Sequence, residues 1–153
     1  MKTMISKNWL VIPFIVSGAA FATEGPIGYV KTVTGDAYVT TAGNKQKANT
    51  GTPVFQGSEL QTAAKSTLGV TFKDETVMSF GPETSLVVDE YLYAPREGKL
   101  KLGSKLAKGT LNYVSGSIAK LKPDAVSVAT PTGTIGVRGT HFVVKVGDQA
   151  PAR

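Results

Sequence analysis

The sequence has no cysteine among its 153 residues. This absence excludes a disulfide framework, a thiol nucleophile, a cysteine-ligated metal and a lipoprotein attachment site. Histidine is also scarce, because His141 is the only one. A zinc site would therefore need carboxylates for its other ligands, and a lone histidine beside a strand is typical of a hydrogen-bonded surface residue. The sequence thus indicates no metal and no cofactor.

Long apolar runs are lacking too. The longest, residues 9–16, is interrupted by a proline and is shorter than the ~20 residues that a membrane-spanning helix needs. It follows Lys2 and Lys7 and precedes an Ala-Phe-Ala site that ends at Ala22, which is the order of a cleavable export signal. We expect residues 1–22 to be a signal peptide, with no transmembrane segment in the mature form and a periplasmic location.

Removing 22 of 153 residues leaves residues 23–153, which is enough chain for one domain with a real core. Helical periodicity is almost absent from this part. Residues 68–72, by contrast, alternate apolar Leu68, Val70 and Phe72 with other residues, which is the pattern of a half-buried strand. Similar patterns predict further short strands at residues 28–33, 37–41, 76–80, 85–89, 91–93, 99–102, 110–114, 116–121, 125–129 and 142–144.

About a dozen short strands define an all-β fold, and their spacing leaves two architectures open. Leu68, Val77 and Leu86 are nine residues apart, so strand and turn recur at an even interval. A β-solenoid-like stack gives this spacing, and so does a meander in a sandwich-like fold. Residues 103–105 are interpreted as a turn or hinge between two of the strands.

The most distinctive segment holds glycine at every third position, at Gly133, Gly136 and Gly139. Such glycines suit tight corners and close approach of neighbouring strands. Arg138 lies among them, and its planar five-donor head is suited to binding several backbone carbonyls at a crowded strand corner. The functional alternative for Arg138 is capture of a carboxylate or phosphate on a ligand. We favour the structural role.

Residues 130–144 resemble the end of the FecR domain, through Thr130-Pro-Thr, Ile-Gly-Val-Arg-Gly-Thr at 135–140, and Phe142-Val-Val. Residues 57–66, with Gly57, Leu60, Thr62 and Ser66 at set intervals, resemble the other recurrent piece of that domain. The resemblance covers roughly residues 28–146. It implies a FecR-like domain over residues 23–153 and assigns a motif, interpreted as structural, to Gly133, Gly136, Arg138, Gly139 and Thr140.

The resemblance implies that this domain is the envelope-side part of a regulator. In signalling members it follows a cytoplasmic anti-sigma segment and a membrane span, and it receives a signal from a TonB-dependent receptor. Here a leader stands in the place of both segments. We therefore expect a non-catalytic binding or sensing module, not an enzyme, that contacts an envelope receptor or sensor domain. Strand addition to an exposed sheet edge is the expected mode of contact.

The formal net charge is +6, and the excess of basic residues is local. Seven basic residues lie between Arg96 and Lys122, against Glu97 alone. This region is a candidate surface for an anionic wall polymer or lipid, and with Tyr91, Tyr93 and Tyr113 it carries the alternative function, a peptidoglycan- or glycan-binding module. The plainer interpretation is a solvated lysine face. No aromatic residues interleave with the lysines, so nucleic acid is not an expected partner.

Two acidic doublets, Asp74-Glu75 and Asp89-Glu90, raise the possibility of a carboxylate pair for glycoside hydrolysis. Adjacent residues on a strand point to opposite faces, so neither doublet is itself a catalytic pair. Turn formation and solubility explain these acids without chemistry. The sequence shows no nucleophile elbow, phosphate loop or dinucleotide motif.

We predict that the exported protein begins at Thr23. Because Trp9 is the only tryptophan, the processed protein should also lack tryptophan fluorescence. Intact-mass measurement of the protein from the soluble periplasmic fraction checks both points. A species in that fraction that retains Met1 would contradict the prediction.

Overall fold

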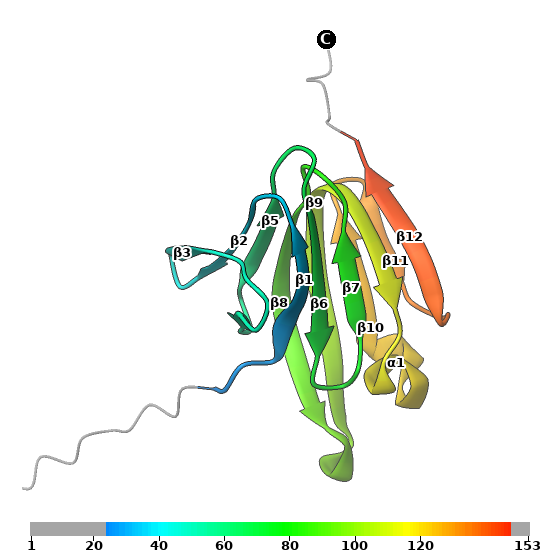
Figure 1. Ribbon diagram of the computed structural model, residues 1–153. Coiled ribbons are helices and arrows are strands. Elements are labelled where there is room, and N and C mark those ends of the chain that lie inside the picture. Colours follow the sequence, from blue (N-terminus) through cyan, green and yellow to red (C-terminus); the bar gives the residue numbers. More distant parts are fainter. Residues whose placement is uncertain (1–23, 148–153) are drawn as a thin grey trace, which may run out of the picture.

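The computed structural model describes residues 24–147, and the expected cleavage site after Ala22 lies outside this range. Twelve strands form one continuous curled sheet that folds over on itself into two packed sheets (Figure 1). No described helix is long and apolar enough to span a membrane. The all-β prediction is confirmed, and helix is confined to one short segment, α1 (Ser117–Leu121), and two 3-10 turns, η1 (Pro95–Glu97) and η2 (Pro123–Ala125).

The front sheet has the strand order β4-β1-β6-β7-β9-β12. Its strands are β4 (Pro53–Val54), β1 (Gly28–Thr34), β6 (Thr67–Phe72), β7 (Val77–Phe80), β9 (Lys99–Val114) and β12 (His141–Val146). The rear sheet has the order β3-β2-β5-β8-β9-β10-β11. Its other strands are β3 (Asn44–Lys47), β2 (Ala37–Thr41), β5 (Glu59–Thr62), β8 (Ser85–Ala94), β10 (Val126–Thr130) and β11 (Gly133–Gly136).

Strand pairing decides between the two expected architectures in favour of a sandwich-like fold. Every pairing is antiparallel except that of β9 with β10, whereas the coils of a β-solenoid stack in parallel. The nine-residue spacing follows from successive strands and turns. Leu68 and Leu86 are buried in different sheets, while Val77 is only half-buried, so the three residues do not stack.

The core lies between the two sheets and is built from the alternate residues that face inward. Leu68, Val70 and Phe72 of β6 are at most 3% exposed, as their alternation predicts. Each such side chain contributes about 1.5–3 kcal/mol of burial free energy. Other fully buried members are Val30, Met78 and Leu111 of the front sheet and Val39, Leu60, Leu86, Leu102 and Val128 of the rear sheet.

Strand β9 belongs to both sheets. Its first half pairs with β8 and β10 in the rear sheet, and its second half pairs with β7 and β12 in the front sheet. The expected turn at residues 103–105 is wrong, because Leu102, Gly103 and Ser104 are buried within one continuous strand. The change of direction comes at Gly109, which has a φ of +93° and whose neighbour Thr110 pairs with β12.

A buried network of hydrogen bonds from two threonine hydroxyls holds the backbone in place at this corner. Thr84 Oγ1 accepts the N–H of Thr110 at 3.0 Å and donates to the carbonyl of Gly81 at 2.9 Å. Thr62 Oγ1 accepts the N–H of Thr84 at 2.9 Å and also donates to Gly81 O at 2.6 Å. The ends of β5, β7 and β8 are thereby joined to β9 at the point where it leaves one sheet for the other.

The expected strand at residues 116–121 is wrong, because this segment forms helix α1. Its first amides are held by a distant residue, Asp74, in the β6–β7 turn. Ser117 N–H donates to the Asp74 carbonyl at 2.6 Å, and Ile118 N–H donates to Asp74 Oδ2 at 3.3 Å. Capping of otherwise unpaired amides favours a helical turn, and Ile118 is then fully buried.

We predict that Gly109→Ala lowers the free energy of unfolding by ~2–5 kcal/mol. The added methyl group would overlap the backbone of Thr84 and would occupy a left-handed conformation that costs non-glycine residues ~1–2 kcal/mol. Gly98→Ala is the matched control, because Gly98 has a φ of +66° but open space around it. Denaturant unfolding should show a loss of only about 1 kcal/mol for the control. Equal losses would contradict the proposed crowding at Gly109.

Candidate binding surface

The residues of the glycine motif lie at the open side of the sandwich, where β11 and β12 form the ends of the two sheets (Figure 1). Gly133 and Gly136 bound β11, and Arg138, Gly139 and Thr140 form the loop that leads to β12. All five residues are exposed. The structure therefore brings the motif together on the surface.

The packing role expected for the three glycines is not found. A Cβ added to Gly133, Gly136 or Gly139 would meet no atom within 4 Å, and none of the three has a positive φ. The fold therefore does not require glycine at these positions. Since the space beside each of them is open, these glycines leave the backbone accessible from outside the molecule.

The backbone contacts expected for Arg138 are likewise not found among residues 24–147. Its side chain is 83% exposed and binds no backbone carbonyl among the described residues. Its Nη2 lies 3.4 Å from Oδ1 of Asp124, whose side chain is 81% exposed. An exposed pair at this distance contributes little to stability. Arg138 is therefore an exposed residue of the loop before β12.

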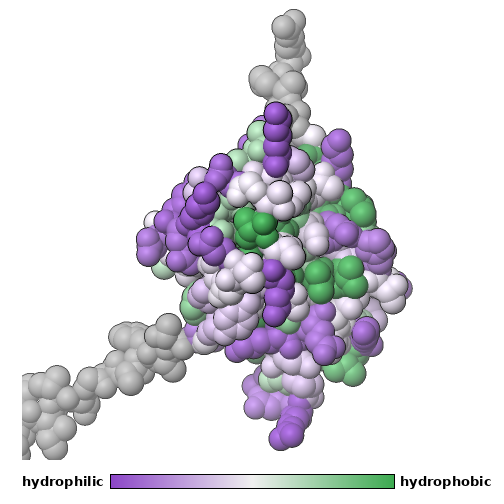
Figure 2. Space-filling view, in the orientation of Figure 1, coloured by the Kyte–Doolittle hydropathy of each residue, from purple (hydrophilic) through white to green (hydrophobic). Residues whose placement is uncertain are grey.

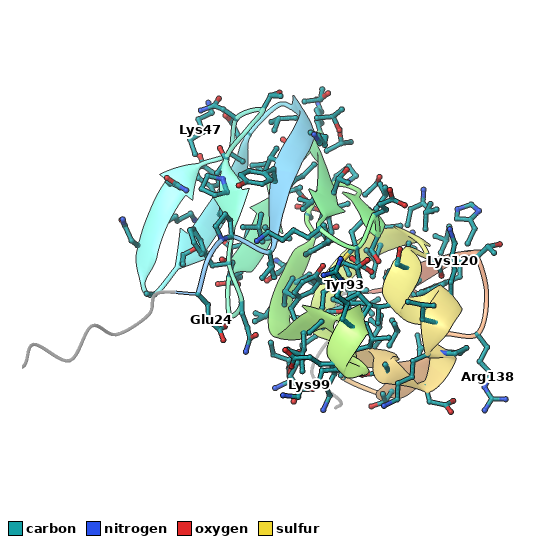
Figure 3. All side chains as sticks on the ribbon, turned by 90° about the horizontal axis from the view of Figure 1, so that it is seen from below. Glu24, Lys47, Tyr93, Lys99, Lys120 and Arg138 are labelled. Atoms are coloured by element: carbon teal, nitrogen blue, oxygen red, sulfur yellow. The ribbon has the colours of Figure 1, made fainter. Side chains whose placement is uncertain are left out.

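Three hydrogen bonds anchor the loop, one before Arg138 and two after it. Val137 is 2% exposed, and its N–H donates to the Val126 carbonyl at 3.3 Å. On the other side, Ser115 N–H donates to the Thr140 carbonyl at 2.9 Å, and Ser115 Oγ donates to the Gly139 carbonyl. With both flanks fixed, the Arg138 side chain points away from the protein (Figure 3).

A cavity of about 490 Å³ lies beneath this loop, and we call it the Arg138 pocket. It is bounded by helix α1, the η2 turn and the loop before β12. Its lining residues are Ser115, Ala119, Lys120, Pro123, Asp124, Arg138, Gly139 and Thr140. Two cations and one carboxylate thus surround the pocket, so its lining carries a net positive charge.

A second cavity, of about 550 Å³, lies between the β10–β11 hairpin and β12, and we call it the edge groove. Ile135 lines one side, and Val144 and Val146 line the other. These three side chains are half-buried and pack against the core, so the groove exposes apolar surface between the last strands of the two sheets. Thr130, Thr132, Gly133, Thr134, Lys145 and Gly147 complete its lining.

Strand β12 has an unpaired backbone edge within the described chain, because it pairs only with β9. The Ser115 N–H donates to the carbonyl of Thr140, and backbone groups alternate in direction along an antiparallel strand. The N–H and C=O groups of Phe142, Val144 and Val146 therefore point to β9. Those of His141, Val143 and Lys145 point to the free edge.

The outer face beside this edge carries exposed apolar side chains. Val143 of β12 is 61% exposed, and Val114 of β9, which pairs with His141, is 40% exposed. Figure 2 shows hydrophobic residues on the side of this face where β12 lies. His141 itself is exposed, and its Nε2 contacts Oδ1 of Asn112, as expected for a hydrogen-bonded surface histidine.

Three of the seven basic residues between Arg96 and Lys122 form ion pairs with nearby acids. On β9, Lys101 binds Glu90 at 2.8 Å and Lys105 binds Asp89 at 3.4 Å, and both acids lie on β8. Lys99 binds Glu97 at 3.2 Å. These pairs agree with the plainer interpretation of a solvated charged face and reduce its attraction for a polyanion.

The tyrosines do not form a surface platform. Tyr113 is fully buried and stacks on Phe142, and Tyr91 is 8% exposed and stacks on Phe72. Burial raises the pKa of Tyr113 to about 12 and raises the pKa of Tyr91 still further, where the Asp74 carboxylate adds to the effect. Only Tyr93 of the three remains partly accessible.

The acidic doublets do not assemble into a catalytic pair. Asp74 is fully buried, and its carboxylate accepts hydrogen bonds from the hydroxyls of Thr76 at 2.7 Å and Tyr91 at 3.1 Å. Asp89 and Glu90 bind lysines on β9. Neither the Arg138 pocket nor the edge groove is lined by two carboxylates, and residues 24–147 contain no group of three potential metal ligands.

Comparison with known proteins identifies the family of the chain. The family model described as "FecR protein" matches residues 58–152, which is more than half of the chain and includes both cavities. The chain belongs to the FecR family. It therefore shares a regulatory signalling domain that is typically periplasmic. No curated protein and no solved structure gives a match.

Asp124 and Ile135 of this FecR domain surface were not predicted as site residues, and Lys120 was predicted only as part of the basic region between Arg96 and Lys122. Lys120 lay in a predicted strand and Asp124 between two predicted strands, and only the helical segment brings them beside Arg138. A signal for the edge groove was present, because Val144 and Val146 alternate with polar Lys145 in the last strand.

We predict that Arg138→Ala changes the free energy of unfolding by no more than about 0.5 kcal/mol, as is usual for an exposed side chain. Val137→Ala is the neighbouring comparison, and removal of its buried methyl groups should cost about 1–3 kcal/mol. Denaturant titration of both variants measures the difference. A loss for Arg138→Ala that matches the loss for Val137→Ala would restore a structural role for the arginine.

Proposed function

We propose that this protein is a periplasmic FecR-domain module without catalytic activity, which senses or transmits a signal by binding another envelope protein. The binding surface is the open side of the sandwich, and the partner contributes an extended strand that pairs with β12. Family membership supports the signalling role. Within residues 24–147 one edge of β12 has no partner strand and lies beside the apolar edge groove, and this observation supports the proposed mode of binding.

Strand addition fits this surface for two reasons. The N–H and C=O groups of His141, Val143 and Lys145 are directed to the free edge, and an added strand would satisfy them. Alternate side chains of that strand would enter the edge groove and cover Ile135, Val144 and Val146, which are only half-buried. Main-chain bonds supply affinity in such complexes, and the groove supplies specificity.

A glycan-binding role receives less support. Carbohydrate platforms need accessible aromatic faces, but Tyr91 and Tyr113 are buried. Attraction of a polyanion needs unmatched positive charge, whereas Lys99, Lys101 and Lys105 each lie within 3.4 Å of a carboxylate. We therefore place the contact at the β11–β12 side rather than on the face of β8 and β9.

We predict that Val143→Pro abolishes capture of the envelope partner while the protein remains folded. Proline removes the Val143 N–H, which faces the free edge and not β9, and edge strands accept proline at such positions. Val143→Thr is the matched control, because it keeps the N–H and the β-branched shape. Native affinity purification from the envelope fraction measures capture, and thermal unfolding verifies the fold.

Recovery of the same partner by the proline variant would contradict strand addition at β12. If neither the wild-type protein nor the threonine control recovers any envelope protein under native conditions, the proposed binding function itself is wrong. The Val143→Thr variant separates a backbone effect from loss of the valine side chain, which is 61% exposed and available for contact.

A further inference from the structure

The Arg138 pocket lies at the first residue of β12 and not along its length. Gly139 and Thr140 line the pocket, and His141 begins the strand immediately after them. The edge groove lies at the opposite end, where Val146 and Gly147 complete its lining. A strand added along β12 therefore has the apolar groove at one end and the Arg138 pocket at the other.

The direction of the added strand decides which of its ends meets the pocket. All pairings of the front sheet are antiparallel, including that of β12 with β9. An antiparallel addition to β12 runs from the Val146 side toward the His141 side. The C-terminal end of the partner strand is then the end that arrives beside Arg138.

The C-terminal end of the added strand would meet two basic residues whose hydrogen-bonding capacity is largely unused. Lys120 of α1 and Arg138 of the loop before β12 line the pocket from two different elements. Lys120 makes no ion pair among the described residues, and Arg138 uses one nitrogen, at 3.4 Å, toward Asp124. A guanidinium has five N–H donors in a fork that matches a carboxylate, so most of its donors remain for a ligand.

Gly139 leaves the entrance open, because a Cβ there would meet nothing within 4 Å. Since the fold does not require this glycine, the space above it is free for an incoming group. Resting on the strand addition proposed above, we propose that the Arg138 pocket binds a carboxylate at the C-terminal end of the added strand, which replaces Asp124 on Arg138. Either an acidic side chain or a terminal carboxylate has the required chemistry.

Synthetic strand peptides test this assignment. All carry alternating valine and threonine and an N-terminal fluorophore. One ends in glutamate with an amidated C-terminus, one ends in glutamine with an amidated C-terminus, and one ends in glutamine with a free C-terminal carboxylate. Fluorescence polarisation with the wild-type protein measures each affinity. We expect one or both carboxylate peptides to bind about tenfold more tightly than the glutamine amide, as charge-assisted hydrogen bonds imply.

The glutamate amide and the free-carboxylate peptide distinguish the two sources of the carboxylate. The tighter binding of carboxylate peptides should disappear in Arg138→Ala and decrease in Lys120→Ala. The preference for a carboxylate should persist in Lys31→Ala, which removes an exposed positive charge from β1, far along the front sheet from β12. A general effect of net charge would instead weaken binding to all three variants alike and would overturn the assignment.

Asp124→Asn should increase the affinity for carboxylate peptides, whereas a misfolded variant could only decrease it. Removing the competing carboxylate should tighten binding of the carboxylate peptides a few-fold and leave the glutamine amide unchanged. If all three peptides bind equally to the wild-type protein and to Arg138→Ala, the carboxylate assignment is wrong while strand addition stands. If none of the peptides binds the wild-type protein, strand addition is overturned and the carboxylate assignment with it.

Discussion

The close approach of Gly109 to Thr84 is the constraint on which the arrangement of the two sheets depends. A single strand, β9, supplies a central pairing surface to both sheets, and it can do so only by changing direction where no side chain intervenes. The hydroxyls of Thr62 and Thr84 then bind the backbone that this turn leaves without ladder partners. Because β12 and β10 both pair with β9, the open side of the sandwich takes its position from the same corner.

A second constraint positions the Arg138 pocket. The buried Asp74 joins the β6–β7 turn to Tyr91 of β8 and to the start of α1. Gly116, just before the helix, lies so close to the backbone of residues 74–76 that a side chain there would overlap it. Helix α1 thereby holds Lys120 at the rim of the pocket. A charged residue that resembles a catalytic acid thus acts as a structural link, and it does so in the interior of the fold.

The sequence predicted the structure best where the alternation of apolar residues by itself determines whether a strand forms. Alternation of Leu68, Val70 and Phe72 correctly predicted a half-buried strand, and the number of such runs predicted an all-β fold. It failed for residues 116–121, because the hydrogen bonds that favour α1 come from Asp74, more than forty residues earlier. Local pattern carries no information about such a distant acceptor.

The binding surface was only partly predictable for a related reason. A glycine in a strand indicates that another backbone is close, but not whether that backbone belongs to the same chain. Gly109 and Gly116 are crowded by their own protein, whereas Gly133, Gly136 and Gly139 face open space. The resemblance located the motif correctly in sequence. Only the fold shows that its Arg138 is directed outward, and that Tyr91 and Tyr113 are directed inward.

Among residues 24–147, β12 pairs with another strand on one side only, and this also determines how the domain opens. A strand held by a single ladder can separate without disturbing any other pairing, so it belongs to the least stable cooperative unit of a sheet. Amide hydrogen exchange in β12 should reflect local opening, while exchange in β6 and β9 should require global unfolding. Because Phe142 stacks on Tyr113, detachment of β12 would uncover the ring of Tyr113 and thus connect the outermost strand to the centre of the core.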